Sequence, residues 1–176
     1  MSNSNWESKF EKIFEAGVLA CKAGEQQPDK LVTTRDQVFL GTIGCTAQEL
    51  FDFADDFCEY GAPDFATVLA VTAIRRRYFL DVQHGIPSQF HVDPHELPPK
   101  NEALDGFRWL PRIIAKARAK LRGELDPSIM YGCGGDRAFL ESIGMTMPQF
   151  LQMVWDAGQD DQAIVEAVKR SLAAVR

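Results

Sequence analysis

The residues best suited to chemistry lie in the second half of the chain, where a basic segment is followed by a glycine-rich loop. The protein has a formal net charge of -6, yet this segment has a single acid, Glu124. Its cations are Arg108, Arg112, Lys116, Arg118, Lys120 and Arg122. Pro111 belongs to the first turn of a helix, because a proline deeper in a helix would remove a backbone hydrogen bond. Arg112 would then lie near the positive end of the helix dipole, which disfavours a cation, so we expect it to have a negative partner.

The loop Tyr131-Gly-Cys-Gly-Gly-Asp136 follows this basic helix. Its glycines expose backbone N–H groups at the start of the next helix, where an anion can be held. We expect the guanidinium of Arg112 to lie within about 4 Å, the limit for an ion pair, of Asp136 or of a bound anion. The alternative is a structural ion pair that joins two helices. Cys133 could be a nucleophile, but no histidine is near in sequence to act as its base, and a packed thiol is the other interpretation.

These residues define one candidate ligand-binding site. Its members are Arg108, Arg112, Lys116, Tyr131, Cys133 and Asp136. They predict that the second half of the chain binds a small anionic molecule. The alternative is a non-enzymatic module for protein interaction or for self-association as a homodimer. No complete catalytic signature is present, so the sequence assigns no catalytic residue and leaves open whether the protein is an enzyme.

The three histidines lie close together, and two of them flank an aspartate in His91-Val-Asp-Pro-His95. In an extended segment His91, Asp93 and His95 would leave the chain on one side, as ligands of Zn²⁺ or Fe²⁺ do. The alternative is a solvated linker in which Pro94 makes a turn. Because a fourth ligand is not evident, we predict no bound metal and no cofactor.

Two further patterns, an acidic run and a possible helix-turn-helix, have simpler interpretations. The acidic run from Glu49 to Glu59 lacks the histidine at i+3 that dinuclear metal sites in helical bundles use, so we interpret it as a solvated helix face. The helix–Gly–Thr–helix pattern is also typical of a helix-turn-helix. Its second helix is acidic in one half of the chain and nearly uncharged in the other, whereas DNA readers need cations there, so no nucleic-acid partner is expected.

The chain repeats itself about a hundred residues apart. Residues 36–46 and 136–146 share six of eleven positions, and the apolar spacing before them also corresponds. This predicts an internally duplicated helical unit. We expect an all-α protein of about eight helices packed as one body, with a first repeat at 1–82, a linker rich in Pro and His at 83–103 and a second repeat at 104–176.

Capping signals place the helix boundaries. Thr46 and Thr146 each begin a capping box three residues before Glu49 or Gln149, which predicts the starts of two helices. The two aspartates that open the repeated segment, Asp36 and Asp136, are expected to be the N-caps of the short helices that follow them. Gly44 and Gly144 are expected to end those helices in the left-handed conformation.

Composition limits the class of protein. The four cysteines show no paired spacing, and the first residues lack the basic start and apolar run of a signal peptide, so we expect reduced thiols and a cytoplasmic location. No apolar run approaches about 18 residues, so no membrane span is expected.

The second half, from residue 104 to about 172, resembles a family of uncharacterised bacterial proteins, domain of unknown function 5069. The resemblance rests on Leu104-Asp-Gly106, Leu110-Pro-Arg112, Lys116-Ala-Arg118-Ala, Gly123, Tyr131, Cys133, Asp136-Arg137, Phe139 and Gly144. Members usually carry an aspartate where this chain has Ala115 and a leucine where it has Gly135. The resemblance implies a small bacterial cytoplasmic protein, with residues 6–82 as a divergent second copy, and it implies no particular activity.

Overall fold

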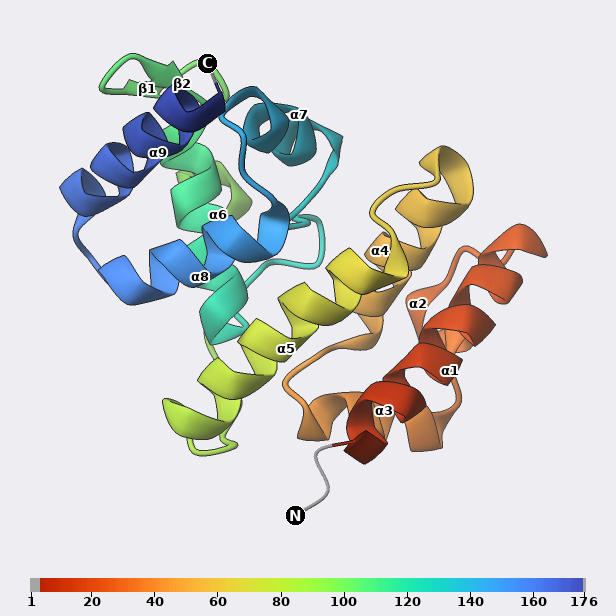
Figure 1. Cartoon of the computed structure of the whole chain (residues 1–176). Coiled ribbons are helices and arrows are strands. Elements are labelled where there is room, and N and C mark those ends of the chain that lie inside the picture. Colours follow the sequence, from red (N-terminus) through yellow and green to blue (C-terminus); the bar gives the residue numbers. More distant parts are fainter. Residues whose placement is uncertain (1–3, 176) are drawn as a thin grey trace. The chain divides into compact units, whose positions relative to one another are not determined.

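The computed structural model describes residues 4–175, and these divide into two compact units between residues 87 and 88. Unit 1 consists of helices α1 (Ser4–Lys22), α2 (Pro28–Leu31), α3 (Thr34–Thr42), α4 (Ala47–Tyr60) and α5 (Phe65–Asp81) (Figure 1). Unit 2 consists of a 3-10 turn η1 (Pro94–Glu96), strands β1 (Ala103–Leu104) and β2 (Phe107–Arg108), and helices α6 (Leu110–Arg122), α7 (Gly134–Ser142), α8 (Met147–Ala157) and α9 (Asp161–Val175).

The prediction of an all-α protein is confirmed. Nine α-helices lie within residues 4–175, and the strands described there are a two-residue antiparallel hairpin. The helix that was not expected is α2, a single turn that starts at Pro28 and buries Leu31. The hairpin was also not expected, because two residues are too few to show the alternation of a strand.

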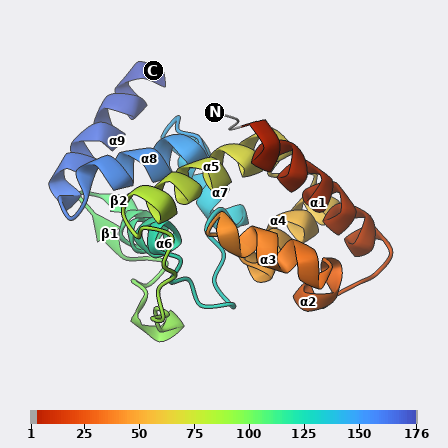
Figure 2. The same cartoon turned by 90° about the horizontal axis from the view of Figure 1, so that it is seen from below.

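Each unit has its own apolar core. In unit 1, α1 packs against α4 and α5, and α2 packs against α4. In unit 2, α6 and α9 pack against α8, and Figure 2 shows α6 nearly end-on with α8 passing across it. The apolar stripe predicted for α6 is buried as expected. Its residues are Leu110, Ile113, Ile114, Ala117 and Leu121.

The predicted capping boxes are confirmed at the start of α4 and of α8. Thr46 accepts from the Glu49 N–H and Thr146 from the Gln149 N–H, and both third-position side chains bond back to the cap. Gly44 and Gly144 have the left-handed φ values of +71° and +69° that were expected after α3 and α7.

The expectation that Asp36 and Asp136 are N-caps is wrong. The residue that caps α3 is Thr33, whose hydroxyl accepts from the Asp36 N–H at 3.2 Å. Helix α7 begins at Gly134, so Asp136 lies at the third helical position with its side chain turned into the core. Both helices start three residues earlier than expected, with Thr33 and Cys133 at the N-cap positions.

The order α6, α7, α8, α9 corresponds to α1, α3, α4, α5, with the capping boxes at equivalent positions. The origin of this correspondence in a duplication stays a prediction.

The segment predicted as a linker contains η1, and its residues from 88 onward belong to unit 2. The N–H of Val92 donates to the carbonyl of Glu124 at 2.8 Å, and the hydroxyl of Ser88 donates to the Glu124 carboxylate at 3.0 Å. These bonds tie the segment to the end of α6. Among the helices described, none has both the length and the apolar character needed to cross a membrane.

Tyr131 joins the glycine loop to the core of unit 2. Its side chain is 1% exposed, and its hydroxyl donates to the Met147 carbonyl at the start of α8, at 2.8 Å. Burial, followed by the nearby negative charge of Asp136, raises the pKa of Tyr131 well above its usual value. The phenol therefore stays neutral in the folded protein and serves as a donor.

Replacing Tyr131 with Phe should lower the free energy of unfolding at neutral pH by about 1 kcal/mol, because one hydrogen bond is lost while the ring remains. The folded-state pKa is raised, so the stability from neutral Tyr131 is fully present below the unfolded-state pKa of about 10 and is lost as pH rises above it. The variant should therefore lose less stability than the natural chain from about pH 10 to 11. Urea unfolding across this range measures both effects, with Tyr60→Phe on the surface as the control at neutral pH. Equal alkaline losses in Y131F and the natural chain would contradict the prediction.

Candidate functional site

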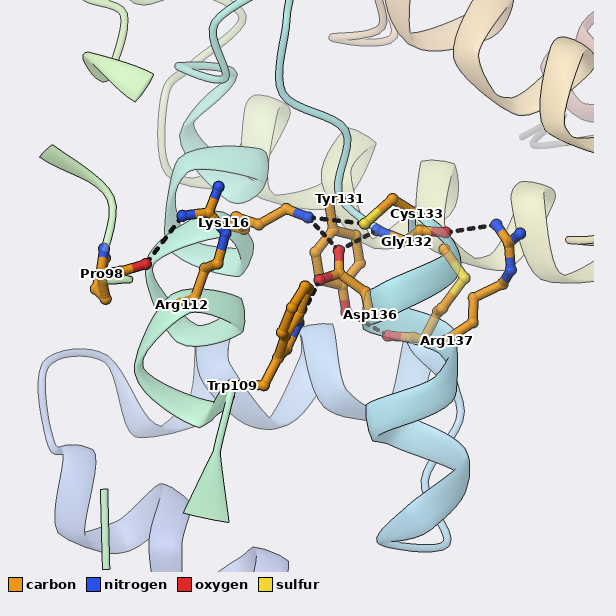
Figure 3. A network of polar contacts seen from close by, with 10 residues as sticks. Pro98, Trp109, Arg112, Lys116, Tyr131, Gly132, Cys133, Asp136 and Arg137 are labelled. Atoms are coloured by element: carbon orange, nitrogen blue, oxygen red, sulfur yellow. Dashed lines mark hydrogen bonds and ion pairs between the residues drawn. The ribbon is translucent and has the colours of Figure 1, made fainter. Parts of the chain in front are cut away.

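A buried ion pair between α6 and α7 lies at the centre of the candidate site (Figure 3). The Lys116 Nζ lies 2.5 Å from an Asp136 carboxylate oxygen, and the two residues are 3% and 0% exposed. Lys116 is on α6 between the buried Ile113 and Ala117, so the helical phase directs it inward. Two opposite charges removed from water require each other, because either one alone would be an uncompensated buried charge.

Asp136 has two further donors, and both come from neutral groups. The indole N–H of Trp109 donates to Oδ1 at 2.9 Å, and the backbone N–H of Gly132 donates to Oδ2 at 2.8 Å. With Lys116, three donors from three segments therefore converge on one carboxylate. Every one of these donors is oriented by the fold, so the carboxylate is bound from three directions.

Two backbone features allow Trp109 to reach Asp136. Trp109 has a φ of +75°, a left-handed conformation that turns the chain between β2 and α6. Gly135 lies against the indole ring, since a Cβ at that position would lie 2.6 Å from Trp109 Cζ2. A side chain at position 135 would occupy the space of the ring, so glycine is required there for close packing.

Cys133 adds a half-buried thiol to the same cluster. Its Sγ accepts a hydrogen bond from Lys116 Nζ at 3.4 Å. Cys133 is also the N-cap of α7, and its side chain makes no capping hydrogen bond there. The first N–H groups of a helix have no partner within the helix. A thiol, an ammonium group and the positive end of a helix therefore meet at one place.

The expected pairing of Arg112 with Asp136 is wrong. Arg112 Nη1 donates instead to the carbonyl of Pro98 at 2.9 Å, and Figure 3 shows its side chain directed away from the glycine loop. The carboxylate is occupied by Lys116, one helical turn further along α6, where the side chain faces the core. Arg112 lies at the edge of the buried stripe, where its guanidinium is bound by a backbone carbonyl rather than by a carboxylate.

The structure thus brings together part of the predicted set. Lys116, Cys133 and Asp136 are in contact, and Tyr131 is adjacent but uses its hydroxyl for Met147. Arg108 is an exposed residue of β2, and no contact of it with this cluster is recorded among the described residues.

Sequence reasoning missed Trp109, the Gly132 N–H and Arg137. Arg137 Nη1 donates to the Gly132 carbonyl at 2.7 Å and so holds the loop from its other side. The residue types gave one signal for the contact between Trp109 and Asp136. An indole N–H that becomes buried needs an acceptor, and a buried aspartate needs several donors. The contact spans 27 positions of sequence, however, and depends on how the β-hairpin folds back.

The weak metal candidates lie on the surface of unit 2. His91, Asp93 and His95 are exposed, and Asp93 accepts from the backbone N–H of His95 at 2.8 Å, which caps η1. In the part of the chain that the structure describes, no group of three or more potential ligand side chains is arranged to hold a metal ion.

Unit 2 is therefore a small helical domain with an ion pair in its core and a thiol at its edge. Residues 95–175 match the family model described as Domain of unknown function (DUF5069). The match confirms the resemblance found in the sequence. The chain has no match among curated proteins or among solved structures. The family's description assigns no activity.

Replacing Lys116 with Met should destabilise the protein by about 3–5 kcal/mol, because the buried Asp136 carboxylate would lose its cation. Lys169→Met is the matched control. It removes a 2.7 Å pair with Asp105 whose side chains are both 45% exposed, and because water screens this pair its loss should change the stability much less. Chemical denaturation of both variants measures the difference. Equal losses would show that the Lys116 pair does not hold unit 2 together.

Gly135→Ala should destabilise the protein by about 1–3 kcal/mol, because the new methyl group must displace the Trp109 ring. Gly134→Ala is the control, since the nearest atom to its added Cβ is Nη2 of Arg137 at 4.0 Å. Thermal unfolding followed by tryptophan fluorescence measures both. A Gly135→Ala protein as stable as Gly134→Ala would contradict the close packing of Trp109 on α7.

Proposed function

We propose that unit 2 binds a small anionic molecule, a carboxylate or a phosphate, at the N-terminus of α7. The observation that supports this proposal is the position of the Lys116 ammonium group, 3.4 Å from the thiol of Cys133 at a helix N-terminus without a side-chain cap. An anion at this place would receive the N–H groups of the first turn and the favourable field of the helix dipole.

The charges around the loop favour an anion over a cation. Asp136 is fully buried and has its donors already in place, so its charge is directed toward Lys116, Trp109 and Gly132 rather than toward the surface. Arg137 brings a second cation to the loop, and its Nη2 lies 4.0 Å from the place that a Cβ of Gly134 would occupy. Gly134 itself is exposed, so a ligand can approach its N–H.

Cys133 would then lie at the inner side of the ligand. Its half-buried sulfur already accepts from Lys116, so the thiol positions the ammonium group next to the helix N-terminus. The proposal is therefore binding, and it assigns no reaction to the thiol.

The alternative is an interaction or self-association module. It is supported by large apolar side chains on the surface of unit 1, such as Val38 and Tyr60, which are 68% and 65% exposed. A mass measurement in native buffer separates the two proposals, because a dimer without affinity for anions would favour the module.

The test of anion binding uses proline to remove a single donor. Proline is well tolerated at the first helical position, where it lacks only an N–H that the helix does not use, and Cys133 has the extended ψ of 168° that a following proline requires. Gly134→Pro should therefore weaken the binding of inorganic phosphate by about tenfold, the contribution of one hydrogen bond to a charged group.

Gly134→Ala is the matched control, since it adds a methyl group and keeps the N–H. Titration with phosphate, followed by the NMR shifts of the Gly135 and Cys133 amides, should give saturable shifts in the natural chain and in the alanine variant. Identical affinity in the proline and alanine variants, or shifts that do not saturate, would overturn the proposed site.

A further inference from the structure

Unit 1 contains a pocket that is separate from the site of unit 2. The pocket has a volume of about 440 Å³ and lies among α1, α4 and α5. Its apolar wall is formed by Phe14, Val18, Leu19, Phe57 and Phe65. This volume suits a small organic molecule, for which protein pockets measure roughly 300–1,000 Å³.

Three phenylalanine rings form one cluster in the wall. The centroid of Phe14 lies 6.0 Å from that of Phe57 and 5.4 Å from that of Phe65, with interplanar angles of 59° and 39°. Tilted rings present faces and edges in several directions. The face of an aromatic ring is electron-rich, so such a wall attracts a cation, and a methylated ammonium group most readily.

Two carboxylates complete the lining of the pocket. Glu11 and Glu15 are one turn apart on α1, so they project from the same side of the helix, and both are exposed. Within residues 4–175 neither has a recorded hydrogen bond or ion pair with another side chain. Two like charges at this spacing repel each other, and a cation between them would relieve the repulsion.

We propose that this pocket binds a small amphiphilic organic cation. The apolar part of the ligand occupies the phenylalanine wall, and its ammonium group lies beside Glu11 and Glu15. The combination of an aromatic wall with two unpaired carboxylates selects this class over neutral apolar molecules, which gain nothing from the charges, and over anions, which the carboxylates repel.

The exposed rim of the pocket suggests one alternative ligand, a helix of another protein. Leu19 is 67% exposed beside the two glutamates, and an amphipathic basic helix of another protein would also cover an apolar surface with an acidic edge. The volume of about 440 Å³ favours the small cation, because a helix needs a groove several turns long.

The test uses the full chain and benzyltrimethylammonium as the probe, with benzyl alcohol as the neutral comparison. Calorimetry or NMR titration should show that the cation binds more tightly than the alcohol. The double variant Glu11→Gln/Glu15→Gln should weaken binding of the cation by about three- to tenfold, the effect of losing two exposed ion pairs, and leave binding of the alcohol unchanged.

The matched control is Glu7→Gln/Glu141→Gln, which removes the same total charge from exposed positions outside the pocket. It should bind the cation as the natural chain does. A third variant, Phe57→Leu, keeps an apolar wall but removes one ring, and it should reduce the preference for the cation over the alcohol.

Several results would overturn the proposal. These are equal affinity for benzyl alcohol and the cation, an equal loss of affinity in the two charge variants, or no binding of the cation at all. Saturable binding of a basic amphipathic peptide without binding of the cation would instead assign the pocket to a protein partner.

Discussion

The arrangement of unit 2 depends on the burial of two opposite charges, the ammonium of Lys116 and the carboxylate of Asp136. Removing each ion from water costs several kcal/mol, so the fold must supply partners for both. Asp136 therefore draws in Trp109 from the β-hairpin and the Gly132 N–H from the loop, in addition to α6. One carboxylate thus determines how three separate segments meet α7.

The same constraint determines what reaches the surface of the site. Lys116 has two recorded acceptors, one fully buried in Asp136 and one half-buried in Cys133. The ion pair with Asp136 fixes the position of the ammonium group, and in that position the group also donates to the Cys133 sulfur. Arg137 holds the opposite side of the loop through the Gly132 carbonyl, so the backbone around Cys133 is fixed from both directions. A binding place at the start of α7 would consequently be preformed by contacts whose main role is structural.

Local signals in the sequence predicted the helices well, and contacts between distant segments were predicted poorly. The capping boxes at Thr46 and Thr146 require only residues three positions apart, so they could be predicted from the sequence. The partner of Asp136 could not be predicted in this way, because Arg112 and Lys116 differ by one helical turn and both belong to a basic run. Helical phase favours Lys116, which lies next to the buried Ile113 and Ala117. Arg112 lies near the positive end of the helix dipole but needs no carboxylate there, because its guanidinium donates to the Pro98 carbonyl.

The contact of Trp109 with Gly135 has a practical consequence for observing this protein. The indole donates to the buried carboxylate, while its ring lies against the first turn of α7. An excited indole is sensitive to nearby charge and to the hydrogen bond at its nitrogen, so we expect a change of these contacts at the start of α7 to alter the emission of Trp109. The protein therefore carries an intrinsic optical reporter next to its candidate site. Trp6 and Trp155 also emit, and replacing both with phenylalanine would leave a single chromophore, positioned where occupancy would be detected.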